Sequence, residues 1–374
     1  MIDIVHFSTV HPRDDSRIRA KMMSALSEAY AGRVSLFVQD GRGDERDSAA
    51  GYDVVDTGPR LRRIKRMSLG GWRMFRAVLR ARPRVAHFHD PELIPWAVAL
   101  RLFGIRMIYD VHEDYPEAVS ENYRLPKAVR TVLPPIVRLF EWASMPFFSA
   151  IVTVTPQIQQ RFDKKRTILV RNFPMVREFH EPADTPMRER PGEFAYIGTI
   201  TQNRNIIGMI EAVGAVRNTG VVLRLAGHFP VAADKDVAMG HPAWDRVRFD
   251  GWVSRDGVAD ILANARAGLV VLKPVAHEMQ TLPIKLFEYM AAGVPVISSD
   301  FPIWRKIVEE AGCGLLVDPD QPEQITEAMQ WMMDNPEQAQ LMGQRGREAV
   351  LARYNWERES ETLIQAYEKI LDGR

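Results

Sequence analysis

A lysine and a glutamate stand near the start of an otherwise apolar stretch, LPIKLFEYMAAGVPVIS at residues 282–298. The run after Pro283 favours a helix that ends before Gly293, and a strand-like apolar run follows. A cation in the first helical turn opposes the helix dipole unless an anion lies above that end. Since free N–H groups at a helix start bind phosphate, Lys285 predicts a phosphate site. Glu288, one turn further on, is placed to accept hydrogen bonds from two sugar hydroxyls; the alternative is a solvent-facing lysine and a charge-paired glutamate.

Strand-like and amphipathic helical runs alternate along both halves of the chain. In the first half we expect strands at 2–8, 34–39, 85–89, 106–112 and 150–155, and helices at 16–31, 92–104 and 126–149. In the second half we expect strands at 193–198, 221–227, 247–252, 267–274 and 313–319, and helices at 204–217, 254–265 and 356–371. This order predicts two parallel sheets, each covered by helices. The proline-rich, charged segment 171–192 between them is predicted to be a linker.

Size and composition limit the class of protein. With 374 residues the chain is too long for one ordinary hydrophobic core and fits two domains. Its single cysteine, Cys313, excludes an intrachain disulfide and favours a reducing compartment. The N-terminus does not have the form of a signal peptide, and no apolar run reaches the about 18 residues of a membrane-spanning helix. These features predict a cytoplasmic protein.

Charge is distributed unevenly along the chain. The first 175 residues hold 28 Lys/Arg and 19 Asp/Glu, and the rest hold 21 and 29, a balance of +9 against −8. Segment 60–84 has ten basic residues and no acid, a pattern that attracts anions. Trp72, Phe75 and Leu79 recur in it at helical spacing, which favours contact with the inner face of a membrane; a solvated face is the alternative. No aromatic pattern typical of nucleic-acid binding accompanies the segment.

Sequence motifs argue against several chemistries. No G-x-G-x-x-G follows the first strand and no G-x-x-x-x-G-K-[ST] occurs, so dinucleotide redox chemistry and P-loop hydrolysis lose their usual support. His87 and His89 have metal-like spacing, but such a pair without further ligands is more often core or site lining. Residues 234–236 and 318–320 match D-x-D, a spacing that is common by chance in charged loops. We therefore expect no metal and no bound cofactor.

The stretch PIKLFEYMAAGVPVI, at residues 283–297, resembles the nucleotide-binding signature of glycosyltransferase family 4, the retaining GT-B enzymes. Further pieces agree with that family in order and spacing: HPRDDSRIRAK (11–21), YDVHEDYP (109–116), YIGTITQNRNI (196–206), LRLAGH (223–228), VRFDGWVSRDGVADILANARAGLVVLKP (247–274) and RYNWERESETLIQAYEKIL (353–371). The resemblance covers nearly the whole chain. It implies an α/β GT-B fold of two doubly wound Rossmann-like domains facing a cleft, with the C-terminal helix crossing back to the N-terminal domain. The implied domains are an acceptor-binding domain at 1–172 plus 355–374 and a donor-binding domain at 173–354.

The resemblance also implies a donor site in the second domain. Glu288 matches the glutamate that binds the nucleotide ribose, the second glutamate of the family's E-x7-E motif. Arg204 matches the basic residue that neutralises the diphosphate, and Lys285 adds to it. The remaining implied donor-binding residues are Gly198, Gly251, Trp252, Val253, Gln280, Thr281 and Leu282. Gln280 replaces the first glutamate of the motif, which leaves the transferred sugar open, and Thr199 stands where many members carry an arginine.

His112 matches the histidine at the family's reaction centre. We therefore expect His112, Arg204 and Lys285 to be the catalytic residues. The first domain is expected to face the acceptor with residues of its first strand-to-helix loop and of a later strand end: His11, Asp15, Arg17 and His89.

The implied function is metal-independent, retaining transfer of a sugar from a nucleotide-diphosphate sugar, with a UDP-sugar favoured. The implied acceptor is a saccharide or a lipid-linked saccharide, as in the synthesis of cell-surface polysaccharides or glycolipids. One alternative is a sugar-nucleotide 2-epimerase of the same architecture, whose acid–base groups would come from His89, Asp90, Glu113 and Asp114. Another is a catalytically silent subunit that binds nucleotide sugar and recruits a partner enzyme.

Overall fold

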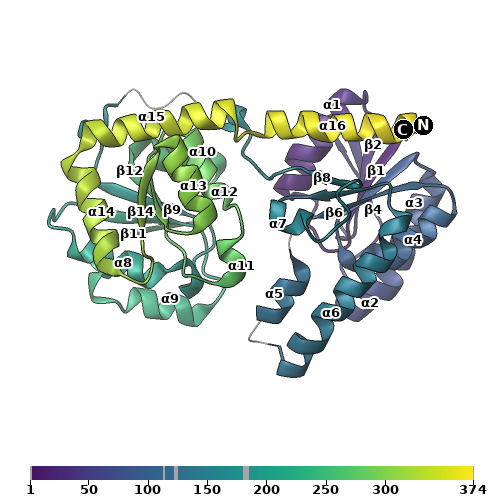
Figure 1. Ribbon diagram of the computed structural model, residues 1–374, viewed down its shortest axis with the longest axis horizontal. Coiled ribbons are helices and arrows are strands. Elements are labelled where there is room, and N and C mark those ends of the chain that lie inside the picture. The colour runs from purple at the N-terminus through teal and green to yellow at the C-terminus, as the bar shows by residue number, and fades with distance from the viewer. Residues whose placement is uncertain (1, 113, 122–124, 180–184, 374) are drawn as a thin grey trace. The chain divides into compact units, whose positions relative to one another are not determined.

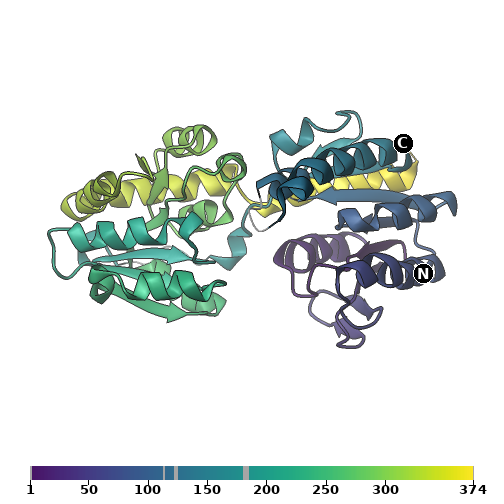
Figure 2. The ribbon, with the colours of Figure 1, turned by 90° about the horizontal axis from the view of Figure 1, so that it is seen from below.

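The computed structural model describes residues 2–112, 114–121, 125–179 and 185–373 (Figure 1). Contacts divide the chain into two compact units: an N-terminal unit of Met1–Asn172 with Trp356–Arg374, and a C-terminal unit of Phe173–Asn355. Each unit is one sheet with helices on both faces, as the edge-on view of Figure 2 makes clear. The predicted fold class, two doubly wound α/β domains, is therefore confirmed.

The sheet of the N-terminal unit has the strand order β3-β4-β2-β1-β5-β6-β7-β8. Its strands are β1 (Ile4–Phe7), β2 (Val34–Val38), β3 (Glu45–Asp47), β4 (Tyr52–Asp56), β5 (Val85–Phe88), β6 (Arg106–Val111), β7 (Ala150–Thr153) and β8 (Thr167–Leu169). All pairs are parallel except the edge pair β3 and β4. The strand order reverses between β1 and β5, where His6 lies in register with His87. In open α/β sheets such a switch point is where ligands bind, beyond the carboxyl ends of the strands.

Helices on both faces of this sheet bury its apolar residues. They are a π-helical segment (Ser16–Met23), α1 (Ser24–Ala29), α2 (Arg63–Lys65), α3 (Gly71–Ala81), α4 (Ile94–Leu102), α5 (Tyr115–Glu121), α6 (Lys127–Ser144), α7 (Pro156–Gln159) and α16 (Trp356–Asp372). The C-terminal helix α16 packs on this unit, as predicted, because Arg84 and Arg106 each donate a 2.7 Å hydrogen bond to a carbonyl oxygen of its last turn. Asn355, which the sequence division placed in this domain, belongs instead to the C-terminal unit; its amide donates to the carbonyl oxygen of Val350.

The C-terminal unit has an all-parallel sheet with the order β11-β10-β9-β12-β13-β14. Its strands are β9 (Glu193–Ile197), β10 (Val222–Ala226), β11 (Val247–Gly251), β12 (Ala265–Val270), β13 (Val296–Ser299) and β14 (Gly314–Val317). The helices that cover it are α8 (Ile206–Ala215), α9 (Ala232–Met239), α10 (Arg255–Asn264), α11 (Ala276–Met279), α12 (Ile284–Ala291), α13 (Pro302–Ala311), α14 (Pro322–Asp334) and α15 (Pro336–Ala352). The switch point lies between β9 and β12, so the loops that follow these strands are the expected place for a ligand.

Most of the predicted linker is in fact folded into the C-terminal unit. Phe173 is 3% exposed, and its ring lies 4.7 Å from that of Phe287 and 5.5 Å from that of Tyr354. Met187 is 1% exposed and belongs to the core of the same unit. Prolines and charges gave this segment the composition of a linker, but its few large apolar residues fix it to the core. Residues 180–184 of the predicted linker lie outside the described residues.

The basic segment 60–84 does not present the apolar face that its periodicity suggested. Phe75 is 7% exposed and packs against the rings of Trp72 and Trp96, so the prediction is wrong for this residue. Of the predicted residues Trp72 is exposed, and the other exposed apolar side chains of the segment are Ile64, Met67 and Leu69. None of the helices in the described part of the chain is both long enough and apolar enough to span a bilayer.

Candidate functional site

The candidate donor site lies at the carboxyl ends of β9 and β11 and at the start of α12. Gly198 follows β9 with a φ of +129°, and Gly227 follows β10 with a φ of +143°, conformations that side chains other than glycine rarely adopt. A Cβ on Gly227 would lie 1.8 Å from the carbonyl oxygen of Gly198, so the two backbones touch. The N–H of Gly227 donates to the carbonyl oxygen of Gly251, at the end of β11, over 2.6 Å. Gly227 was not singled out from the sequence. It contacts Gly198 and hydrogen-bonds to Gly251, both of which are predicted donor-binding residues.

Lys285 reaches back from the first turn of α12 over the end of β9. Its Nζ lies 3.7 Å from the centre of the Tyr196 ring, and 3.3 Å from where a Cβ on Gly198 would be. Burial and, to a smaller extent, the nearby charge of Arg204 lower the pKa of Lys285 to about 7, against the opposing effect of Glu288. A buried ammonium beside a second cation is poised to accept an anion.

The start of α12 supplies backbone donors beside this lysine. The helix is entered through Pro283, which caps it without a side-chain hydrogen bond. The first N–H groups of a helix have no intrahelical acceptor, so they point at whatever lies above that end. The predicted phosphate site therefore has three neighbouring donors in the structure: backbone amides, the Lys285 ammonium and the Arg204 guanidinium.

Arg204 is held by the carboxylate of Glu278, two residues before Gln280. Its Nη1 lies 3.1 Å from Oε2 of Glu278, whose residue is 9% exposed, while the Arg204 side chain is 31% exposed. Thr201 caps the short helical turn that carries Arg204, and Asn205 ends that turn with a φ of +55°. The pairing leaves Arg204 ordered but still reachable from solvent.

Glu288 lies on α12 with its side chain 18% exposed, and its Oε1 is 3.4 Å from Nη1 of Arg255 on α10. The same guanidinium nitrogen lies 3.4 Å from a carboxylate oxygen of Glu178. The Glu288 carboxylate is thus accessible and only weakly paired with Arg255. A carboxylate that gives up this partner to bind ribose hydroxyls needs both properties.

The remaining predicted donor-binding residues differ in their exposure to solvent and in their packing. Trp252 is 80% exposed, whereas Val253 packs partly buried on the core. The Thr281 hydroxyl donates to the Glu278 carbonyl oxygen over 2.9 Å. Leu282 packs against the core, and Gln280, in place of the motif's first glutamate, is exposed.

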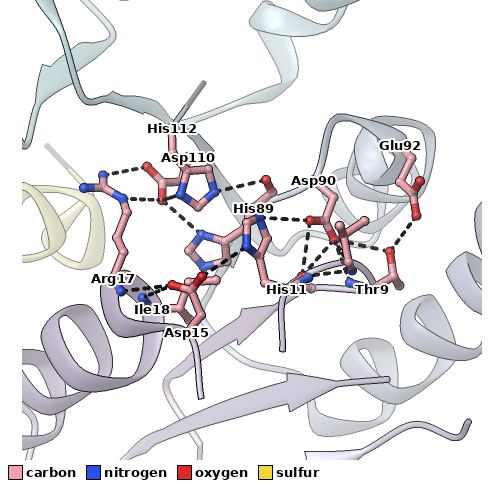
Figure 3. A network of polar contacts seen from close by, with 12 residues as sticks. Thr9, His11, Asp15, Arg17, Ile18, His89, Asp90, Glu92, Asp110 and His112 are labelled. Atoms are coloured by element: carbon pink, nitrogen blue, oxygen red, sulfur yellow. Dashed lines mark hydrogen bonds and ion pairs between the residues drawn. The ribbon is translucent and has the colours of Figure 1, made fainter. Parts of the chain in front are cut away.

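A second group of polar side chains lies at the carboxyl ends of β1, β5 and β6 in the N-terminal unit, at the switch point of its sheet (Figure 3). At its centre is Asp110, which receives Nη2 of Arg17 over 2.9 Å and Nε of Arg17 over 3.2 Å. Both residues are buried, and Arg17 also donates to the Val170 carbonyl oxygen. Burial favours the neutral acid, but the charge of Arg17, with smaller contributions from the neighbouring histidines, outweighs it and holds the pKa of Asp110 well below its usual range.

His112, the predicted reaction-centre residue, borders this group with its side chain 16% exposed. Its Nε2 donates to the His89 carbonyl oxygen over 3.3 Å, and its Nδ1 lies 3.5 Å from Oδ2 of Asp110. Burial lowers the pKa of His112 to about 4, although Asp110 acts in the opposite direction. The ring is therefore neutral at pH 7. Because a carbonyl only accepts, its proton is on Nε2.

His11 lies between two carboxylates on the loop after β1. Its Nδ1 is 3.3 Å from Asp15 and its Nε2 is 3.6 Å from Asp90. Burial opposes the charged ring, yet the Asp15 hydrogen bond and the nearby carboxylates raise the pKa of His11. The ring also lies 4.7 Å from the ring of His112. The predicted acceptor-side residues are thus brought together around His112, with Arg17 and His89 buried and His11 and Asp15 part-exposed.

Among the residues that the structure describes, His87, His89 and Asp110 have the spacing of metal ligands, within 4.8 Å of one another. Hydrogen bonds account for this spacing. Nδ1 of His89 bonds to Asp110 and Nε2 of His89 bonds to His6, each over 3.0 Å, so neither nitrogen is free. Asp110 is already paired with the cation of Arg17. Of the acid–base residues considered for an epimerase, Asp90 is committed to the loop after β1 through the backbone N–H of Thr9, and Glu113 lies outside the described residues.

Comparison with known proteins identifies the family of the chain. Residues 178–349 match the family model of glycosyl transferases group 1, and residues 20–172 match that of glycosyltransferase family 4. Alpha-D-kanosaminyltransferase from Streptomyces kanamyceticus is 21% identical over 292 residues, 72% of each chain. Sucrose-phosphate synthase from Thermosynechococcus elongatus superposes with a TM-score of 0.79 at 18% identity, over 100% of both chains. HepE from Anabaena, solved with UDP-glucose, superposes with a TM-score of 0.73 at 10% identity, over 99% of this chain and 100% of its own.

The two family models together span the N-terminal and C-terminal units, and the similar structures share the whole fold. The chain belongs to the group 1 glycosyltransferases of glycosyltransferase family 4, and its fold is GT-B.

Proposed function

We propose that the protein transfers a sugar from a nucleotide-diphosphate sugar to a saccharide or lipid-linked acceptor with retention of anomeric configuration. The observation that carries the proposal is the position of Lys285, buried over Tyr196 at the end of β9, beside Arg204 and the start of α12. A leaving diphosphate develops negative charge, and preorganised cations and backbone amides stabilise it. We propose that these groups make the reaction independent of a metal.

We further propose UDP as the nucleotide and Glu288 as the ribose ligand. Support for UDP comes from HepE, a protein of similar fold that was solved with UDP and with UDP-glucose. Support for Glu288 comes from its accessible carboxylate on α12, one turn beyond Lys285. On the acceptor side, neutral His112 offers its ring edge to the reacting sugar, and the saccharide acceptor places the enzyme in cell-surface polysaccharide or glycolipid synthesis.

Glu288→Ala is expected to weaken UDP binding about 10- to 150-fold, because it removes a charge-assisted hydrogen bond of roughly 1.5–3 kcal/mol. A thermal-shift screen with UDP, GDP, ADP and their sugars selects the nucleotide, and titration calorimetry gives the affinity. Glu178→Ala is the matched control, because Glu178 contacts the same Arg255 nitrogen at the same 3.4 Å distance. We expect Glu178→Ala to bind UDP like the wild type; equal affinity of Glu288→Ala and wild type would remove the ribose assignment.

Product analysis separates transfer from the two alternatives. Transfer predicts that nucleotide diphosphate is released in step with a new glycosidic bond and only when acceptor is present. A change in the sugar nucleotide without acceptor would identify a 2-epimerase instead. Nucleotide binding without turnover of any donor would identify a silent subunit.

We also propose that the N-terminal unit binds an anionic membrane surface. Support comes from the large exposed apolar side chains of α6, which recur at helical spacing along one stripe: Val132, Ile136, Leu139, Phe140 and Trp142. The basic segment 60–84 is close by, since Arg63 donates a 2.8 Å hydrogen bond to the hydroxyl of Tyr115 on α5, and α5 packs on α6. Apolar and cationic groups on one surface are the combination that binds anionic lipid.

Leu139→Asp combined with Ile136→Asp is expected to lower binding to phosphatidylglycerol vesicles at least tenfold, because burying each apolar side chain contributes on the order of 1 kcal/mol or more. The measurement is vesicle co-sedimentation at low and high salt, and wild-type binding should fall with salt. Leu341→Asp, which changes a leucine of similar exposure on the C-terminal unit (49% against 63% for Leu139), should bind like wild type. Equal binding by all three proteins would exclude α6 as the contact.

A further inference from the structure

Five polar groups are buried under α16 on one face of the N-terminal sheet. Three are histidines, His6 of β1, His87 of β5 and His89 directly after β5, with exposures of 0%, 0% and 2%. The others are Asp110 of β6 and Tyr367 of α16, both 0% exposed. Burying so many polar groups in a sheet face is costly unless each is hydrogen-bonded.

The five groups form one unbranched chain of hydrogen bonds. Asp110 Oδ2 lies 3.0 Å from His89 Nδ1, and His89 Nε2 lies 3.0 Å from His6 Nδ1. His6 Nε2 lies 2.8 Å from the Tyr367 hydroxyl, which in turn lies 2.7 Å from His87 Nδ1. The other ring nitrogen of His87, Nε2, is buried without a hydrogen-bond partner among the described residues. The chain therefore has two distinct ends, a carboxylate and a bare ring nitrogen.

Donor and acceptor roles fix the direction of every bond. The Asp110 carboxylate only accepts, so His89 carries its proton on Nδ1 and its Nε2 accepts. His6 must then donate from Nδ1, which leaves its Nε2 to accept from the Tyr367 hydroxyl. The hydroxyl oxygen accepts from Nδ1–H of His87, and Nε2 of His87 is left as a lone pair. Each link requires a neutral ring. Burial is the largest influence on the three histidines, and it lowers the pKa of each.

Two members of the chain, Asp110 and His89, are also the contacts of His112. The carboxylate that accepts from His89 is the one that lies 3.5 Å from Nδ1 of His112. The carbonyl oxygen that accepts from Nε2 of His112 belongs to His89 itself. A change in the position of His89 would therefore alter both contacts that orient His112.

We propose that Tyr367 of the C-terminal helix is a positioning residue, whose hydroxyl holds the rings of His6 and His87 in place and, through His6 and His89, the orientation of His112. The inference rests on the proposed function, in which His112 contacts the reacting sugar. Without the hydroxyl, Nε2 of His6 becomes a buried acceptor without a donor, and Nδ1–H of His87 becomes a buried donor without an acceptor. The Asp110 carboxylate still sets the tautomers of His89 and His6, so the loss acts on the position of the His6 ring and, through it, on His89.

Long-range ¹H–¹⁵N spectra of protein labelled with ¹⁵N-histidine test the chain directly. In the wild type we expect His6, His87 and His89, assigned by single substitutions, to be neutral and protonated on Nδ1 between pH 6 and 8. In Tyr367→Phe we expect His87, whose Nδ1–H has lost its acceptor, to lose this pattern, while His6 and His89 keep it because the Asp110 carboxylate still sets their tautomers. Tyr30→Phe is the matched control. Tyr30 lies beside Tyr367, with rings 6.4 Å apart, but its hydroxyl has no hydrogen-bond partner among the described residues.

Kinetics provide the second readout. Tyr367→Phe should lower kcat about tenfold, the effect of one hydrogen bond on the barrier, and leave the KM for nucleotide sugar and the UDP affinity within about twofold, because the ring stays in place. Tyr30→Phe should keep wild-type kcat and KM. An unfolded or globally loosened protein would instead lose UDP-induced thermal stabilisation and kcat together.

Two results would overturn the inference. A wild-type spectrum in which any of the three histidines is protonated on Nε2, or titrates between pH 6 and 8, would refute the chain. A Tyr367→Phe protein with wild-type tautomers and wild-type kcat would refute the positioning role. The spectra need no substrate and, if Tyr367→Phe does not fold, the wild-type spectrum alone decides the chain. Absence of transfer by the wild-type protein would refute the proposed function but not the tautomers.

Discussion

Replacing Lys285 by methionine is expected to lower turnover of nucleotide sugar by roughly 10- to 150-fold. In the proposed function the ammonium makes a charge-assisted contact with the departing diphosphate, worth roughly 1.5–3 kcal/mol, and each 1.36 kcal/mol of barrier is tenfold in rate. Methionine keeps an apolar side chain of similar length against the Tyr196 ring, so the fold should be retained. Lys306→Met is the matched control, because Lys306 lies on α13 of the same unit and is 74% exposed. We expect its turnover to equal that of the wild type.

The same variant should abolish a pH dependence of UDP binding. In the free protein burial lowers the pKa of Lys285 to about 7. Bound phosphates favour the charged amine and raise its pKa, so binding above pH 7 takes up a proton. UDP affinity should fall as pH rises from 7, by at most about tenfold per unit, and Lys285→Met should bind weakly with a flat profile.

The lowered pKa of Lys285 also makes the stability of the unliganded protein depend on pH. Because the folded-state pKa of Lys285 lies below the unfolded value, the unfolded chain binds more protons between about 7 and 10.5. The contribution of this lysine to the free energy of unfolding therefore rises with pH across that range. Wild-type turnover in Lys285→Met, or a pH-independent UDP affinity in the wild type, would contradict the assignment of Lys285 to the diphosphate.

Asp110→Asn is expected to destabilise the N-terminal unit by about 3–5 kcal/mol, because it leaves the Arg17 guanidinium buried without its counter-charge. The pair is nearly sealed from solvent, with the Arg17 side chain 4% and the Asp110 side chain 0% exposed. Urea unfolding followed by hydrogen exchange on β1 and β6 measures the loss in this unit.

Two further variants make this measurement specific. Asp53→Asn breaks the ion pair with Arg46 on the same sheet, whose side chains are 53% and 63% exposed, and should cost no more than about 1 kcal/mol. Arg17→Met combined with Asp110→Leu removes both charges and should recover much of the stability lost in Asp110→Asn. A single Asp110→Asn variant as stable as the wild type would show that Arg17 finds another partner.

The fold class and the helix start around Lys285 could be predicted from the sequence because both depend on local patterns. The alternation of apolar strands and amphipathic helices predicted two doubly wound sheets, and in such sheets loops at strand ends meet at a switch point. The run around Lys285 and Glu288 predicted a phosphate-binding helix start, because a cation in a first turn is a local conflict that an anion resolves. Neither inference needed to know which residues far apart in the chain come together.

The pairings that complete the two sites were decided only by the tertiary structure. Glu278 pairs with Arg204, 74 residues away, and Tyr367 bonds to His6, 361 residues away. Such contacts depend on strand register and on where a helix docks, and a shift of one residue along a strand would turn each side chain to the other face. The same reason explains the burial of Phe75 and Phe173: composition made their segments look like surface or linker, while packing against distant rings placed them in the cores.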